Sequence, residues 1–251
     1  MIFPIGDDNS DRTSLPVVNY LLIAANILVF VFLQGFGEND KFTYAYSTVP
    51  EEIITNRDID TVVPIKDPIS QKQVGEIDLQ PTPVSVYITL ITAVFMHGGF
   101  AHLFGNMLFL WIFGDNIENS LGKARYLLFY LVCGVIASLS HVFATVAFSG
   151  NRFIPSLGAS GAISGVLGAY ILLFPSRKVR VIMFSVFTEV PAFVAIGLWF
   201  VFQIVSGLGW LGSGSAVGGV AYGAHIGGFI AGLVLIKLFA IGRNKQMRII
   251  S

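Results

Sequence analysis

Long apolar runs alternate with short polar segments along most of the chain. A membrane-spanning helix needs about 20 largely apolar residues, with a range of about 17 to 25. Six stretches approach or meet that length, so the pattern predicts an all-α membrane protein built as a bundle of six transmembrane helices. The predicted spans are Val17 to Leu33, Phe100 to about Ile117, Tyr126 to Phe148, Gly158 to Phe174, about Pro191 to Val205, and Ala216 to Leu238.

The polar segments between the spans complete a single membrane domain over residues 1–251. Residues 1–16 form a polar N-terminus, and residues 34–99 form a long, acidic first loop. Val84 to Met96 in that loop is apolar but too short to span, which predicts an interfacial or re-entrant piece. Val181 to Phe187 is expected at the membrane interface, with Glu189 near the start of the fifth span. Residues 239–251 form a basic tail.

The distribution of basic residues predicts the orientation. Six spans place both termini on one side, and Lys and Arg in short loops sort to the cytoplasm. Of the 15 Lys and Arg residues, ten fall on the side of the termini. We therefore expect cytoplasmic termini, with the first loop and the Gly-rich segment Ser206 to Gly219 in the other compartment. Because no transit peptide is apparent, a plasma or inner membrane is expected.

The composition supports a membrane environment for the chain and argues against one class of partner. Hydrophobic residues make up 54% of the chain and charged residues only 12%, whereas soluble domains carry roughly 25% charged residues. A formal net charge of zero argues against a nucleic-acid partner. The single cysteine, Cys133, lies in an apolar run and is expected to be a small core residue.

A serine opens the fourth span within the sequence Gly158-Ala159-Ser160-Gly161. The glycines at 161, 165 and 168 lie on one helical face and let a neighbouring helix approach closely. Ser160 borders that face at one end of the span. Taken alone, the motif is explained better by helix packing than by catalysis, so Ser160 is a candidate nucleophile only in combination with other groups.

A histidine in the sixth span could complete such a combination. His225 shares a helical face with Gly228 and Gly232, and this face can pack against the glycine face of the fourth span, including Gly165. A serine hydroxyl becomes a nucleophile when a neutral imidazole accepts its proton. No Asp or Glu falls plausibly inside the bundle to orient the imidazole, which favours a Ser-His dyad over a triad. The alternative is a histidine that only joins two helices by hydrogen bonds.

Two further polar side chains lie one turn apart in the second span. His102 and Asn106 point to one helical face and could stabilise the negative oxygen of a tetrahedral acyl intermediate. Interhelical hydrogen bonding is the alternative. A zinc site fits poorly because the sequence has no His-Glu-x-x-His motif, and we expect no metal or cofactor.

These motifs together resemble the rhomboid family of intramembrane serine proteases. The matching pieces are HLFGN at residues 102–106, GASG at residues 158–161 and AHIGGFIAG at residues 224–232, in the order of the family. The resemblance implies that Ser160 is the nucleophile and His225 the general base, with His102, Asn106 and the backbone N–H of Ser160 binding the oxyanion. It also implies that small residues hold the fourth and sixth spans together, including Gly158, Gly161, Gly165, Gly228 and Gly232.

The resemblance further implies a reaction and a partner. The expected function is hydrolysis of peptide bonds in or near transmembrane segments of other membrane proteins, which enter from the bilayer past the fifth span. The segment around Trp210 would resemble a mobile cap. Some relatives carry an aromatic residue one turn after the nucleophile, where this chain has Ser164, so what orients His225 is left open, as is the oligomeric state.

Two other classes of function serve as alternatives. A rhomboid-like protein could bind client helices without cutting them, although the presence of both Ser160 and His225 argues against this. A channel or secondary transporter would be expected to show paired repeats and charged residues at mid-membrane, and the sequence shows neither.

Overall fold

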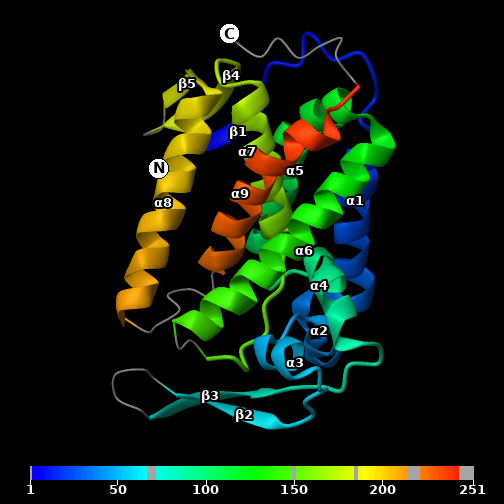
Figure 1. The fold of residues 1–251 in the computed structure, drawn as a ribbon, viewed down its shortest axis with the longest axis vertical. Helices are drawn as coiled ribbons and strands as arrows, with labels where there is room; N and C mark the ends of the chain where they lie inside the picture. The colour runs from blue at the N-terminus through cyan, green and yellow to red at the C-terminus, as the bar shows by residue number, and fades with distance from the viewer. Residues whose placement is uncertain (1, 67–71, 149–150, 184–185, 214–220, 243–251) are drawn as a thin grey trace.

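A bundle of helices forms the body of the molecule, with a small sheet at one end and a layer of short elements at the other (Figure 1). The computed structural model describes residues 2–66, 72–148, 151–183, 186–213 and 221–242. The start of the first strand and the end of the last helix lie at the same end of the bundle.

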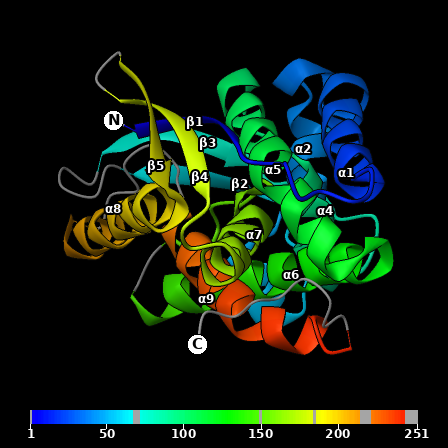
Figure 2. The same ribbon diagram turned by 90° about the horizontal axis from the view of Figure 1, so that it is seen from above.

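Helices occur at all six predicted spans, with ends that differ by a few residues. They are α1 (Val17–Leu28) with its π-helical continuation η1 (Val29–Leu33), α5 (Phe100–Leu121), α6 (Lys123–Ala147), α7 (Ser160–Leu173), α8 (Ala192–Ser213) and α9 (Tyr222–Phe239). The predicted start of the sixth span and most of the predicted basic tail lie outside the described residues. Viewed along the bundle, α7 lies at the centre, among α5, α6, α8 and α9 (Figure 2).

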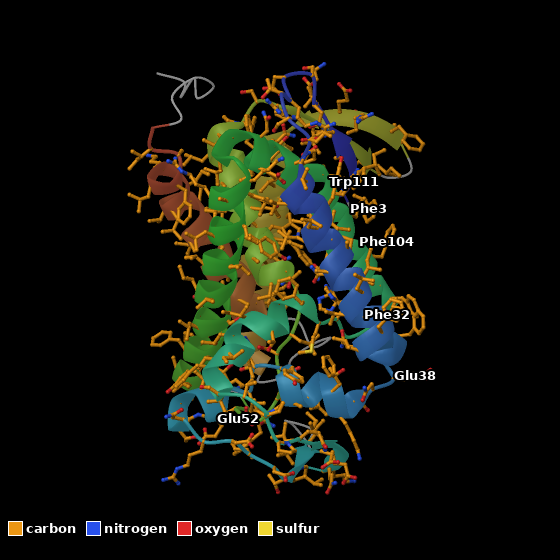
Figure 3. The ribbon with its side chains drawn as sticks, turned by 90° about the vertical axis from the view of Figure 1, so that its right-hand side faces the viewer. Phe3, Phe32, Glu38, Glu52, Phe104 and Trp111 are labelled. Carbon is orange, nitrogen blue, oxygen red and sulfur yellow. The ribbon has the colours of Figure 1, made fainter. Side chains whose placement is uncertain are left out.

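Length and composition identify fewer spans than the sequence pattern suggests. Within the described residues, α6 and α9 are long and apolar enough to cross a membrane. A third span is added if the short helical stretch Val86–Phe95 and α5, which meet at a bend, count together as one. Large apolar side chains cover the outside of α1, η1 and α5. Phe32 of η1 is 75% exposed and Phe104 of α5 is 64% exposed. They form a band between Trp111 and the level of Glu38 (Figure 3), as expected of a surface that faces lipid.

The first loop is ordered into a layer of short elements. It contains η2 (Gly35–Gly37), α2 (Asp40–Tyr46), α3 (Pro50–Thr55) and the antiparallel hairpin of β2 (Val62–Lys66) and β3 (Gln73–Asp78). The short apolar stretch that follows forms η3 (Val86–Ile88), α4 (Thr89–Thr92) and η4 (Ala93–Phe95). This stretch lies at 80° to α5, so it does not continue that helix.

The fold is mostly helical, as predicted, but it is not all-α, because the described residues also form two small sheets. Besides the first-loop hairpin, β1 (Ile2–Asp7), β4 (Lys178–Met183) and β5 (Val186–Pro191) form an antiparallel sheet in the order β1-β4-β5. In β4, buried Val179 and Val181 alternate with exposed residues, which is the period-two pattern of a half-buried strand. Glu189 accordingly lies on β5, beside Lys178, and not at a helix N-terminus.

Helices α7 and α9 approach until their backbones touch. A Cβ atom added at Gly232 would overlap the carbonyl oxygen of Gly165, and one at Gly228 would overlap that of Gly161. On the other side of α7, a Cβ at Gly165 would lie 2.6 Å from the Cβ of Cys133 on α6. Glycine is therefore required along this contact for space and not for backbone conformation.

Replacing Gly232 by alanine is expected to lower the stability of the bundle. Overpacking costs about 1–3 kcal/mol where side chains can move, and a backbone carbonyl cannot move aside without shifting a whole helix. The midpoint of thermal unfolding in detergent should fall. Gly105→Ala is the matched control, because nothing lies within 4 Å of a Cβ at that position, and it should leave the midpoint unchanged or raise it slightly. Equal midpoints for Gly232→Ala and wild type would contradict the close approach.

A buried carboxylate fastens the N-terminal strand to the bundle. One Asp7 oxygen accepts hydrogen bonds from the Tyr170 hydroxyl of α7 at 2.5 Å and the Asn116 amide of α5 at 2.8 Å. Burial raises the pKa of Asp7 to about 7, and the charge of Asp115 adds to the rise, while the Tyr170 hydrogen bond and the charge of Arg177 oppose it. The strand is therefore held most firmly when Asp7 carries a proton.

Stability of the N-terminal attachment is expected to fall as the pH rises through about 7. Folding raises the pKa of Asp7 above its value in an unfolded chain, so the proton stabilises the folded state, and this contribution is lost when Asp7 ionises. Thermal unfolding of wild type and Asp7→Asn between pH 5 and pH 8.5 measures the effect. Burial also raises the pKa of Glu52 to about 7, so the difference between the two proteins is the informative quantity. A difference that does not change with pH would refute the assignment.

Candidate active site

A serine and a histidine from the two contacting helices meet in a hydrogen bond. The Nε2 atom of His225 lies 2.7 Å from the Oγ atom of Ser160. Ser160 is the first residue of α7, and His225 is the fourth of α9. The glycine contact between the helices brings these two ends to the same level, and His225 is buried. The structure thus juxtaposes the two residues that the sequence singles out.

The position of Ser160 within the bundle follows from the shortness of α7. Its 14 residues extend for about 21 Å at 1.5 Å per residue, less than the roughly 30 Å of a bilayer core. The segment before Ser160 is fixed by its backbone: the Gly158 N–H donates to the carbonyl of Ala93 at 2.8 Å, and Ser156 forms a two-bond antiparallel bridge with Thr48 of the first loop. The backbone hydrogen-bonding groups of this irregular segment are thus paired with other parts of the protein, as a non-helical segment inside a membrane requires.

A glutamine on α8 contacts the other nitrogen of the imidazole. The Oε1 atom of Gln203 lies 2.8 Å from Nδ1 of His225, and Gln203 is only 6% exposed. The sequence reasoning missed this residue. A signal was present, because Gln203 is a strongly polar side chain inside a predicted span, and such side chains are functional candidates by default.

Within the described part of the chain, the imidazole hydrogen-bonds to Ser160 and Gln203, and not to Ser164 or Tyr222. The Ser164 hydroxyl donates to the backbone carbonyl of Ser160 at 2.6 Å, so it satisfies the first turn of α7. Tyr222 packs beside Gly207 of α8, where an added Cβ would lie 3.2 Å from the tyrosine Cβ. The imidazole also faces Trp199 of α8, with ring centroids 6.0 Å apart.

His102 and Asn106 approach the site from α5. A Cβ added at Gly158 would lie 2.9 Å from Nε2 of His102 and 3.7 Å from Oγ of Ser160, so the His102 ring and the serine flank the same glycine. The Asn106 amide nitrogen is buried and has no hydrogen-bond partner among the described residues, which leaves a donor available to a ligand. His97 packs edge-on against His102, with ring centroids 5.1 Å apart.

Gly158 differs from the helix-packing role expected for it. It lies two residues before α7 and has a φ angle of +124°, a conformation that side chains rarely adopt. Its place is therefore set by the turn into α7 and by the His102 ring. Gly161, Gly165, Gly228 and Gly232, by contrast, lie along the α7–α9 contact.

A small pocket adjoins Ser160. Its walls come from η4, α6, α7, α9 and the segment before Ser160. Most of its lining residues are Ala, Gly or Ser, including Gly134, Ala137, Ser138 and Ala224. Within the described residues, no group of three or more His, Cys, Asp or Glu side chains is arranged to hold a metal ion. The predicted cap around Trp210 lies outside the residues whose side chains are described.

The fold and the site define a helical membrane protein with a serine–histidine pair between two packed helices. Residues 85–241 match the model of the rhomboid domain, and the chain belongs to the rhomboid family, which confirms the resemblance seen in the motifs. This family includes intramembrane serine proteases.

Three curated relatives illustrate the similarity. Rhomboid protein 1 of yeast mitochondria is 35% identical over 68% of this chain and 48% of its own length. The rhomboid protease GluP of Bacillus subtilis is 30% identical over 86% of this chain and 34% of its own length. The human presenilin-associated rhomboid-like protein is 36% identical over 39% of this chain and 26% of its own length. The chain thus spans about half the length, or less, of the curated relatives it matches.

Gly158→Ala is expected to disrupt the site while sparing the bundle. The added Cβ would lie 2.8 Å from Cε1 of His102, and the positive φ angle adds a backbone cost of order 1–3 kcal/mol. Labelling of Ser160 by a fluorophosphonate should slow by at least about tenfold, since about 1.4 kcal/mol corresponds to that factor. Gly98→Ala is the control, because its Cβ would lie 3.8 Å from His102. Wild-type labelling of Gly158→Ala would contradict the proposed constraint.

Proposed function

We propose that the protein is an intramembrane serine endopeptidase that cleaves transmembrane protein substrates in or near their membrane segments. The observation that carries the proposal is the 2.7 Å contact between Nε2 of His225 and Oγ of Ser160. In the proposed reaction His225 accepts the serine proton as Oγ attacks the scissile carbonyl, and later delivers it to the leaving amine. No metal or cofactor takes part.

The oxyanion of the tetrahedral intermediate would be bound by His102, Asn106 and the backbone N–H of Ser160. Two observations support this role: the buried amide nitrogen of Asn106 has no hydrogen-bond partner in the described part of the chain, and His102 lies beside Gly158. Preorganised donors stabilise charge that develops only during the reaction, and they do so strongly where water is excluded.

The surroundings of Ser160 favour small residues near the cleaved bond. The adjoining pocket is lined mainly by Ala, Gly and Ser, which leaves room for little more than a small side chain. A substrate helix must also unwind before its carbonyl can be attacked, because a helix engages its own carbonyls in hydrogen bonds. We therefore expect small or helix-breaking residues around the cut.

The proposed topology has six transmembrane helices and cytoplasmic termini in a plasma or inner membrane. It is supported by the six helices at the predicted spans and by the gathering of Arg12, Arg177 and Arg180 around the sheet end of the bundle. The active site and the first loop would then face the other compartment. Substrates would enter from the bilayer past α8, whose outer face exposes Val201, Phe202 and Val205.

The decisive experiment is fluorophosphonate labelling of the purified protein, combined with cleavage of a model membrane protein in liposomes. Wild type should be labelled at Ser160 and should cut the substrate. Ser160→Ala should do neither, and His225→Ala should lose cleavage because no base remains. If the folded wild type is not labelled, or if Ser160→Ala is labelled equally, the protease assignment fails and a non-cutting binder of client helices becomes the better description.

Removing the oxyanion donors should slow cleavage without abolishing substrate binding. Loss of one such donor typically costs about 10²- to 10³-fold in kcat, and Asn106→Ala is expected to fall in that range with the Ser–His contact intact. Asn26→Ala provides a control, because that buried amide donates to its own helix at Leu22. Cleavage by Asn106→Ala at the wild-type rate would remove Asn106 from the site.

A further inference from the structure

The imidazole of His225 is held from two sides by two different helices. Its Nε2 atom faces Ser160 of α7 at 2.7 Å, and its Nδ1 atom faces Oε1 of Gln203 of α8 at 2.8 Å. Both His225 and Gln203 are buried. Every polar ring atom of the histidine is therefore engaged by the protein.

The chemistry of the glutamine oxygen fixes the state of the ring. An amide oxygen only accepts hydrogen bonds, so Nδ1 must carry the hydrogen and donate it to Gln203. In a neutral imidazole the other nitrogen then has a free lone pair. That nitrogen is Nε2, the atom that faces the Ser160 hydroxyl. The contact thus selects the tautomer in which His225 can act as a base toward Ser160.

A neutral orienting group suits this location. A carboxylate buried among apolar helices would carry a large desolvation cost, whereas an amide costs less and still accepts the Nδ1 hydrogen. Helix α8 packs against α9 close to the site, because Phe200 of α8 stacks on Phe229 of α9 with ring centroids 3.9 Å apart. This packing brings Gln203 of α8 within hydrogen-bond distance of the His225 ring. Trp199, one turn before Gln203, faces the same imidazole.

We propose that Gln203 is a positioning residue that sets the tautomer and orientation of the His225 base. The inference rests on the proposed function, because it assigns a role in the Ser160–His225 reaction. It means that α8 contributes directly to the chemistry and is more than a wall of the substrate entrance. The Ser164 hydroxyl instead donates to the backbone carbonyl of Ser160.

The test compares Gln203→Met, which keeps the volume but removes the acceptor, with Gln203→Glu, which keeps an acceptor. Val234→Ala is the control, because this exposed residue lies on α9, nine residues beyond His225, and has no place in the proposed substrate entrance. Four quantities are measured for each protein: the thermal unfolding midpoint, the rate of fluorophosphonate labelling, kcat and KM for a membrane substrate, and the pH–rate profile. The small probe reports on serine activation without passage of a substrate helix.

In Gln203→Met, labelling and kcat should fall together by about 10- to 100-fold. This loss is smaller than the roughly 10²- to 10⁴-fold of a whole general base, because His225 itself is still present. KM should change by less than about twofold, because substrate binding is intact. Gln203→Glu should restore the rate at alkaline pH. Its acid limb should move to higher pH, because a carboxylate stabilises the protonated imidazole. Val234→Ala should match wild type in labelling, kcat and KM.

Two results would overturn the inference. One is a folded Gln203→Met protein with wild-type labelling, kcat and pH profile. The other is an equal loss in Gln203→Met and Gln203→Glu that follows a lowered unfolding midpoint, which would show a packing role only. Either result leaves the protease assignment standing as long as Ser160→Ala is inactive in the same assays, so failure of the two proposals is distinguishable.

Discussion

The backbone contact between α7 and α9 is the constraint on which the rest of the structure depends. Where Gly165 meets Gly232, and Gly161 meets Gly228, no side chain separates the two helices. Without a hydrophobic driving force in lipid, such close packing supplies much of the attraction between helices. It also sets the separation of Ser160 and His225, because a larger spacing would carry the hydroxyl out of hydrogen-bond reach of the imidazole.

Much of the fold could be predicted from apolar run lengths, because a bilayer imposes a length on any helix that crosses it. The sheets were missed for the complementary reason. Outside the bilayer the length rule does not apply. The alternation of polar and apolar residues from Lys178 to Val181 has the two-residue period of a half-buried strand, but it must be read for that period to indicate one. The partner strand β1 lies more than 170 residues earlier, a separation over which periodicity carries no pairing information.

The residues of the candidate site also fall into those that the sequence could single out and those that it could not. Ser160, His225, His102 and Asn106 could be singled out because polar residues and glycines in apolar runs are conspicuous. Gln203 obeyed the same rule, but the rule does not say toward which neighbour a polar side chain points. That direction depends on how α8 is rotated, and its sequence is apolar almost all round. Gly158 was assigned to packing because the start of α7 was placed two residues early, a common error at helix ends.

The bridge between Thr48 and Ser156 joins the first loop to the segment that leads into Ser160. Residues 34–84 precede the part of the chain that matches the rhomboid domain, yet they supply one half of this bridge. For protein engineering, the first loop and the segment that leads into Ser160 are one module. A graft that transplants either segment into a different scaffold must carry the other with it, or provide a substitute backbone partner for Ser156.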